Sequence, residues 1–152
     1  MCGIAGIISR NQFSEQLLRS MTDSLTHRGP DDSGYEIIKS DNFLTGLGQR
    51  RLSIIDLSAQ GHQPMTNEDY SVWITFNGEI YNYLDLRDDL IKKGHIFRSK
   101  TDTEVIIHGY EEYGTAFFNK MNGMFAFALW DKYTETLILC RDRFGKKPLY
   151  YA

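Results

Sequence analysis

The stretch MCGIAGIIS, residues 1–9, opens the chain with a cysteine followed by small, apolar and β-branched residues. Residues 3–9 predict a buried strand, because a short apolar run rich in β-branched residues is typical of a strand inside a sheet. Chain termini usually fray unless the fold holds them. A buried strand here would hold the terminus, so Cys2 is expected at a fixed position.

Cys2 gains a special chemistry if Met1 is removed, which is the usual outcome when the second residue is small. The thiol and a free α-amine then belong to the same residue. Their reference pKa values are about 8.5 and about 7.7–8.0, so the amine can accept the thiol proton near neutral pH. This pairing supplies a nucleophile and a general base together. A cysteine at position two also arises by chance, so this feature alone does not fix a function.

The composition describes an ordinary globular domain. The 152 residues are 41% hydrophobic and 24% charged, with a formal net charge of −3. That length suits one domain with a substantial core, and the charge gives no basic surplus for nucleic acid. The apolar stretches are too short to cross a membrane, and residues 1–8 lack the flanking features of a signal peptide.

The two cysteines favour a reducing, cytoplasmic compartment, because they form neither a CxxC pair nor a disulfide framework. Cys140 continues a β-rich apolar run and is expected to be an inert core thiol.

Periodicity and turn signals predict the order of elements along the chain. Helices are expected at about residues 11–26, at 81–93 before Gly94, and from an N-cap at Thr101 or Asp102 to Gly114. Residues 27–34 and 56–70 are expected to be loops, the second long enough to be functional. Strands are expected at 35–38, 43–48, 51–55 and 71–76, with a hairpin over 124–131 and 136–142. Helices packed on antiparallel sheets give an α+β layered domain.

The segment FNGEIYN, residues 76–82, follows a predicted strand and precedes a predicted helix. An Asn-Gly step often marks a tight hairpin turn, but here no paired strand follows. The alternative is an exposed loop at the strand end that offers the Asn77 amide and the Gly78 backbone N–H. Two fixed donors of this kind can form an oxyanion hole. Glu79 beside them can receive a substrate ammonium group or cap the helix.

Isolated charges next to apolar strands give weaker signals. An arginine at a strand end can bind a carboxylate through two hydrogen bonds, although Arg50 is better explained as a surface ion pair. Asp102 is expected to be a helix N-cap, with any ligand role additional. The four histidines lack a metal-binding spacing such as HExxH, so no metal site is predicted. The segment GLGQRR, residues 46–51, lacks the last glycine of a nucleotide-binding fingerprint and is not interpreted as one.

Seven motifs in this order resemble the glutaminase domain of glutamine-dependent asparagine synthetases, the class II glutamine amidotransferases. They are MCGIAGI, HRGPDDSG, RLSIIDLSAQGHQPM, NGEIYN, TDTEVI, GMFAFALWD and RDRFGKKPLYY. They are spread along the sequence, so the resemblance covers essentially the whole chain. The resemblance implies a four-layer αββα sandwich of the N-terminal-nucleophile hydrolase type over residues 1–152.

The resemblance also implies roles for individual residues. Cys2, exposed by loss of Met1, attacks the side-chain amide of glutamine and forms a glutamyl thioester, while Asn77 and Gly78 hold the oxyanion. Glu79 and Asp102 bind the α-ammonium group, and Arg28 in the RGPD loop supports the pocket. Arg51 binds the α-carboxylate, beside backbone atoms of Leu52, Ser53, Ile54 and Ile55. The product is L-glutamate, and the ammonia is used in amidation.

The resemblance sets expectations about partners and cofactors. L-Glutamine and the synthetase domain of the parent protein are the expected partners, with no nucleic acid and no membrane. The glutaminase domain is expected to need no cofactor or metal, since ATP and Mg²⁺ serve the synthetase domain. The SGGxDS-type loop of that domain is absent from this sequence, so the chain is expected to be an isolated glutaminase module.

Two alternatives to asparagine synthesis stay open from the sequence. The parent protein can instead amidate a sugar acid in surface-polysaccharide biosynthesis. If Met1 is retained, the chain can be a non-catalytic glutamine-binding module.

Overall fold

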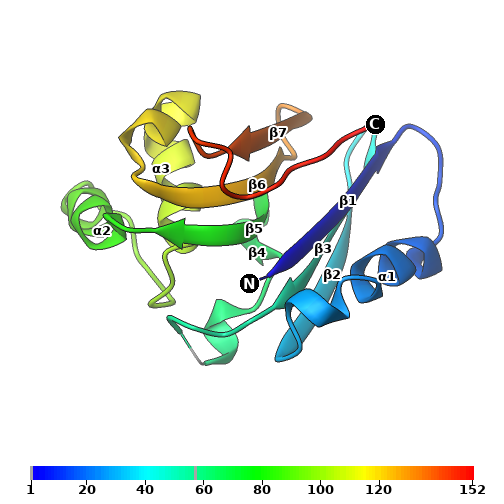
Figure 1. Ribbon diagram of the computed structural model, residues 1–152. Helices are drawn as coiled ribbons and strands as arrows, with labels where there is room; N and C mark the ends of the chain where they lie inside the picture. The colour runs from blue at the N-terminus through cyan, green and yellow to red at the C-terminus, as the bar shows by residue number, and fades with distance from the viewer. Residues whose placement is uncertain (1, 57) are drawn as a thin grey trace.

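Two antiparallel sheets lie face to face between helical layers in the computed structural model, which describes residues 2–56 and 58–152 (Figure 1). The first sheet has the order β1-β3-β2, with β1 at Gly3–Ser9, β2 at Asp32–Lys39 and β3 at Leu44–Arg51. The second has the order β4-β5-β6-β7, at Met65–Thr66, Val72–Ile80, Gly123–Asp131 and Thr136–Arg141. The predicted strand at residues 3–9 and the predicted hairpin are confirmed.

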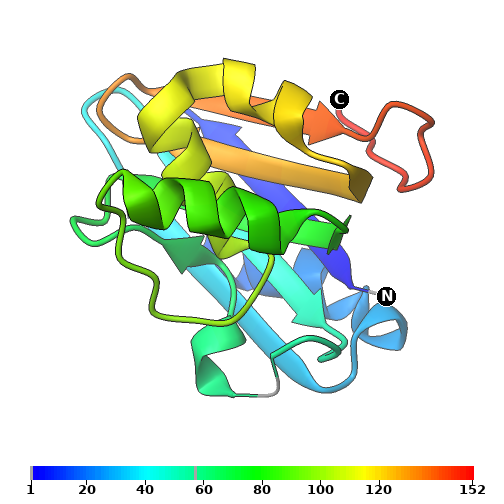
Figure 2. The ribbon, with the colours of Figure 1, turned by 90° about the vertical axis from the view of Figure 1, so that its left-hand side faces the viewer.

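Helices cover the outer face of each sheet. Helix α1 (Glu15–Asp23) packs on the first sheet, and its N-cap Ser14 accepts a hydrogen bond from the Leu17 N–H. Helices α2 (Tyr83–Lys92) and α3 (Glu104–Tyr113) cover the second sheet and lie in front of it in Figure 2. Short 3₁₀ helices η1 (Thr26–Arg28), η2 (Ala59–Gly61) and η3 (Gly114–Lys120) complete the elements. This arrangement confirms the expected four-layer αββα sandwich.

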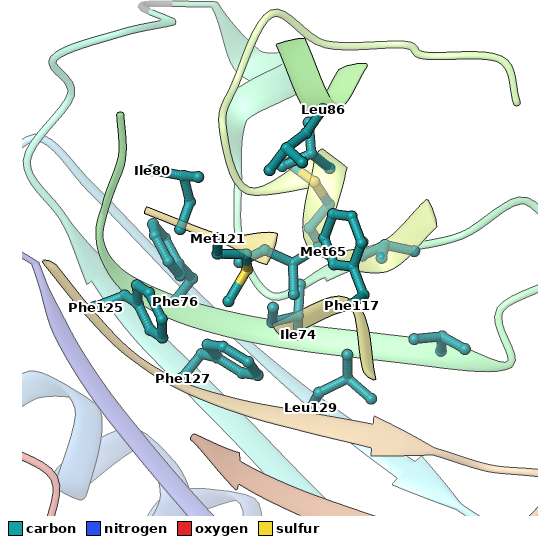
Figure 3. Close-up of a cluster of buried hydrophobic side chains, with 14 of the residues drawn as sticks. Met65, Ile74, Phe76, Ile80, Leu86, Phe117, Met121, Phe125, Phe127 and Leu129 are labelled. Atoms are coloured by element: carbon teal, nitrogen blue, oxygen red, sulfur yellow. The ribbon is translucent and has the colours of Figure 1, made fainter. Parts of the chain in front are cut away.

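The larger hydrophobic core fills the space between the second sheet and its helices (Figure 3). Alternate residues of β5, among them Ile74 and Phe76, meet Leu86 of α2 and Ile106 of α3 there. A smaller cluster lies between the two sheets and includes Leu47 and Trp130. This division follows from the period of two in strands, which sends successive side chains to opposite faces.

Several predicted element boundaries are wrong. Helix α1 is shorter than residues 11–26, and β2 begins at Asp32, inside the predicted loop, because its first residues pair with the end of β3. The predicted strand at 51–55 does not form, since β3 ends at Arg51. There the Leu52 N–H bonds the Cys2 thiol and the Ser53 N–H bonds Asp31, so neither joins a strand ladder.

Two errors concern predicted site residues. The Asn77–Gly78 step is not an exposed loop, because β5 continues through it to Ile80 in unbroken pairing with β6. Asp102 is not the N-cap of α3; that position belongs to Thr103. The ends of α2 and α3 are close to prediction, with Gly94 and Gly114 following them at positive φ.

Candidate active site

Cys2 lies at a fixed position at the start of the first sheet. The pairing of β1 with β3 sets Gly3 opposite Arg50 and brings the thiol next to Leu52. The Leu52 N–H donates to Sγ at 3.4 Å, and the Leu52 carbonyl lies 3.8 Å from Sγ. The terminus is therefore tied down at Cys2, as the sequence predicts; Met1, whose removal matters for the chemistry, lies outside the described residues.

A pocket opens beside the Cys2 thiol, where the first sheet faces β5. Most of the residues singled out from the sequence line it, namely Cys2, Arg51, Leu52, Ile54, Ile55, Asn77, Gly78, Glu79 and Asp102. They come from four separate parts of the chain, and the fold gathers them around one space. Ser53 and Arg28 are not among the lining residues.

Asn77 and Gly78 reach the pocket from the middle of a strand. Asn77 is buried, and both residues pair with β6, at Ala126 and Phe125. A Cβ atom at Gly78 would lie 2.4 Å from the Met124 carbonyl oxygen and 2.7 Å from Phe125 Cα. Only glycine allows β6 to approach this closely. The two candidate oxyanion donors are thus held by a sheet ladder, which is a more rigid support than a loop.

Two carboxylates make one side of the pocket negative. The buried Asp102 side chain accepts a hydrogen bond from the Ile80 N–H at 2.8 Å. Burial raises the pKa of Asp102 to about 6, and the nearby Glu79 carboxylate adds to the rise. Two facing carboxylates with one raised pKa are the arrangement that a cationic ligand group would relieve.

Arg51 faces the pocket from the end of β3 and supports the segment that follows it. Its guanidinium donates to the Ser58 carbonyl at 3.3 Å and to the Asp56 carbonyl. A guanidinium has five N–H donors, so these two contacts leave others for a ligand carboxylate. Arg50 instead points away into an ion pair with Asp23 at 3.4 Å, as the sequence predicts.

The RGPD loop packs against the backbone of residues 51–53, next to the Arg51 side chain. The Asp31 N–H donates to the Arg51 carbonyl at 3.1 Å, and the Asp31 carboxylate accepts from the Ser53 N–H at 2.8 Å. Burial lowers the pKa of Lys147, and the positive charge of Arg28 in η1 lowers it further. Asp31 thus holds the loop against residues 51–53, and a supporting role for Arg28 stays a prediction.

Two residues that line the pocket, Lys147 and Gln63, were not predicted from the sequence. Lys147 is buried in the lining, within electrostatic reach of Cys2 and Glu79. Gln63 ties two walls together, donating to Thr103 Oγ1 at 3.1 Å and accepting from the Phe76 N–H at 2.7 Å. Lys147 stands in RDRFGKKPLYY and Gln63 in the polar connection at 56–70, so both could have been found by treating those motifs as part of the site.

Other sequence predictions can be placed as well. Cys140 is half-buried on β7 against the larger core, where burial raises the pKa of its thiol, as expected for a core cysteine. Three possible metal ligands, His95, His108 and Glu111, come together outside the pocket lining. Within the described part of the chain, no helix has the length and apolar character that a membrane crossing demands.

Comparisons with known proteins identify relatives that match along the whole chain. The chain is 44% identical to asparagine synthetase [glutamine-hydrolyzing] 1 of Bacillus subtilis, over all of this chain and 24% of the relative. It is also 44% identical to asparagine synthetase [glutamine-hydrolyzing] 2 of Arabidopsis thaliana, over 99% of this chain and 25% of the relative. The chain thus spans about a quarter of the length of these curated relatives.

Solved structures support the fold independently of sequence. The glutamine phosphoribosylpyrophosphate amidotransferase of B. subtilis superposes with a TM-score of 0.73 at 19% identity, over 93% of this chain and 37% of the other. The model of the family described as "Glutamine amidotransferase domain" matches residues 1–152. The chain therefore belongs to the glutamine amidotransferase domain family.

Proposed function

We propose that this chain hydrolyses L-glutamine to L-glutamate and ammonia through a thioester on Cys2. The observation that supports this most is the gathering of a thiol, an arginine, two carboxylates and the Asn77–Gly78 pair around one pocket. Glutamine is a zwitterion with a neutral reactive amide. Arg51 is complementary to its α-carboxylate, Glu79 and Asp102 to its α-ammonium group, and the Asn77–Gly78 pair to its neutral amide.

The proposed binding mode follows from that match. Arg51 binds the α-carboxylate through parallel hydrogen bonds, beside the backbone of residues 52–55. Glu79 and Asp102 bind the α-ammonium group, which compensates the cost of two neighbouring negative charges. The side-chain amide then lies toward Cys2, and its oxygen toward Asn77 and Gly78.

The proposed reaction has two steps. Once Met1 is removed, the α-amine of Cys2 takes the thiol proton while Sγ bonds to the amide carbon. Asn77 and Gly78 stabilise the oxyanion, a contribution worth about 10²–10³ in rate per donor. The carbon–nitrogen bond breaks as the amine passes its proton to the leaving nitrogen, which departs as ammonia. Water then cleaves the thioester, releasing glutamate and restoring the thiol.

The role of the whole protein is a further part of the proposal. The curated relatives are named as glutamine-hydrolysing asparagine synthetases, which favours aspartate over a sugar acid as the ammonia acceptor. The partner is then a synthetase domain that binds ATP and Mg²⁺, while the glutaminase domain needs no cofactor. Two free thiols, Cys2 and Cys140, favour a cytoplasmic location.

The test compares the two cysteines. Protein whose intact mass confirms loss of Met1 is incubated with glutamine, and glutamate and ammonia are measured. We expect Cys2→Ala to lower the rate by about 10³-fold or more, because no other group replaces the nucleophile. Cys140→Ala, a change of the same kind outside the pocket, should keep the parent rate. Equal rates in Cys2→Ala and the parent, or glutamine binding without turnover in the mature protein, would refute the proposal.

A further inference from the structure

Two histidines and a glutamate come together at the junction between α2 and α3, away from the glutamine pocket. His95 lies on the connection between the helices, and His108 and Glu111 are one turn apart on α3. Glu111 Oε2 lies 2.9 Å from His108 Nδ1 and 3.7 Å from His95 Nδ1. One ligand atom from each of the three residues lies within 4.8 Å of the others.

These separations are close to what a zinc ion requires. Ligands at about 2.0–2.1 Å from a tetrahedral Zn²⁺ lie about 3.3–3.4 Å from one another. The two distances from Glu111 Oε2, 2.9 Å and 3.7 Å, fall on either side of that value. His95 lies on a connecting segment, so it can approach the other two ligands without moving a helix. Two histidines and a glutamate are also a known zinc ligand set.

A second carboxylate lies near the other ring nitrogen of each histidine, as is common in metal sites. A histidine that binds a metal through one ring nitrogen usually donates a hydrogen bond from the other ring N–H to a carboxylate or carbonyl. His95 Nε2 lies 3.3 Å from Glu112 Oε2, and the buried His108 Nε2 lies 3.6 Å from Glu104 Oε1. His108 Nε2 makes no hydrogen bond within the described residues. Both rings therefore turn Nδ1 toward Glu111 and Nε2 toward a separate carboxylate.

Glu111 is fixed on its other side and reaches solvent. Its Oε1 accepts a hydrogen bond from Asn67 Nδ2 at 2.8 Å, which leaves Oε2 for the histidines. Its side chain is 25% exposed and lines a groove together with Glu68 and Asp69. The carboxylates of this groove raise the local concentration of cations beside Glu111.

We propose that His95, His108 and Glu111 form a binding site for a divalent cation of the Zn²⁺ class. Bound there, the ion would clamp the α2–α3 connection to α3. The same connection continues into Thr101, Asp102 and Thr103, which line the glutamine pocket. The three residues lie outside the lining of the glutamine pocket, so the proposal stands whether or not the chain hydrolyses glutamine.

The competing account is a metal-free network of ion pairs. Burial opposes a charge on His108, but its contacts with Glu104 and Glu111 outweigh this and raise its pKa to about 9. In that account the ring is an imidazolium held between two carboxylates, and a metal ion would have to displace its Nδ1 proton. The two accounts differ in whether Zn²⁺ binds at all.

The experiment is a titration of metal-free chain with Zn²⁺ in a Cys2→Ala background, which removes the competing pocket thiol. We expect one ion per chain by calorimetry and a higher Tm with Zn²⁺ than without it. His95→Gln and Glu111→Gln should each weaken binding by about tenfold or more. His62→Gln is the matched control, because His62 is exposed and pairs with Asp32 elsewhere, and it should bind as the parent does.

Co²⁺ serves as a spectroscopic probe of the ligands. Nitrogen and oxygen ligands should give visible d–d bands without a thiolate-to-cobalt charge-transfer band. Absence of Zn²⁺ binding at micromolar concentrations would overturn the proposal in favour of the ion-pair network. Undiminished binding in a folded His95→Gln variant, or a thiolate band that assigns the metal to Cys140, would overturn it equally.

Discussion

At the scale of single residues, the ionised carboxylate of Asp102 lowers the stability of the fold and places a negative charge in the pocket. Its carboxylate is buried and its pKa is raised to about 6. The usual value in an unfolded chain is about 3.9. Folding therefore favours the protonated form, and the free energy of unfolding decreases as the pH rises from about 4 to about 6. An ionised Asp102 costs stability that an ammonium group of the ligand would recover.

This account predicts opposite effects of Asp102→Asn on stability and on activity. Asparagine keeps an oxygen that can accept from the Ile80 N–H, but it carries no charge. The variant should have a higher Tm than the parent at pH 7.5 and show no such gain at pH 4, where the parent carboxyl approaches neutrality. Its KM for glutamine should rise by about tenfold or more, because the ammonium group loses a charged partner. Melting curves at both pH values and steady-state kinetics test this; an equal gain in Tm at both values would contradict it.

Two adjacent lysines give a second prediction at this scale. Lys147 is buried in the pocket lining near Cys2 and Glu79, whereas Lys146 is exposed. Lys147→Met keeps much of the side-chain volume and removes the positive charge, so kcat/KM for glutamine should fall by about tenfold, which equals about 1.4 kcal/mol. Lys146→Met makes the same change in net charge and should leave kcat/KM unaltered. If both variants lose activity equally, the effect is one of net charge and not of the pocket.

At the scale of elements, the sequence predicts most helices and strands. It does not predict the contacts that residues near the ends of these elements make with distant parts of the chain. The NGE segment shows the limit: glycine and asparagine are typical of turns, yet here they lie inside β5. Close packing of β6 on Gly78 requires a glycine there, and that contact comes from residues more than 40 positions away. Asp102 has the pattern of an N-cap, but its carboxylate bonds the Ile80 N–H in another element. Local propensity cannot reveal such long-range partners.

Asp56 joins two of the segments that line the pocket and gives the prediction for this scale. Its carboxylate accepts from the Ser58 N–H at 2.9 Å and from the Lys100 N–H at 2.9 Å. Hydrogen bonding by the Ser58 side chain, together with these two backbone hydrogen bonds, lowers the pKa of Asp56 to about 2. A lowered pKa stabilises the fold above about pH 4, and this contribution is lost as the pH falls toward 2.

Asp56→Asn should therefore lower Tm by several degrees at pH 7 and have a much smaller effect near pH 2, because asparagine cannot accept from both backbone groups as a carboxylate does. The exposed Asp41 provides the control, and Asp41→Asn should change Tm little at either pH. Scanning calorimetry at the two pH values measures the difference. A loss that is the same at both would show that the hydrogen-bond geometry, and not the charge, carries the effect.

At the scale of the whole molecule, the α+β class follows from the order of elements, but the meeting of the two sheets does not. The sheets contact each other through buried polar groups as well as apolar ones. Thr75 Oγ1 on β5 donates to the Gly48 carbonyl on β3 at 3.0 Å, and Gln49 Nε2 on β3 donates to the Phe76 carbonyl at 2.7 Å. In the sequence these residues look like ordinary strand positions. Their hydrogen bonds join β3, which pairs with β1 directly after Cys2, to β5, which carries Asn77.

Two buried threonines test how much these contacts between the sheets contribute. Thr75→Val removes a hydrogen bond that crosses the layer between the sheets, and it should reduce the free energy of unfolding by about 0.5–1.5 kcal/mol. Thr45, on β3, is equally buried, but within the described residues its hydroxyl has no hydrogen-bond partner. Thr45→Val, the same chemical change, should be neutral or stabilising, because it removes an unsatisfied buried group. Urea unfolding of the two variants and the parent measures both values. Equal destabilisation by the two changes would mean that valine's shape, and not the hydrogen bond between the sheets, decides the outcome.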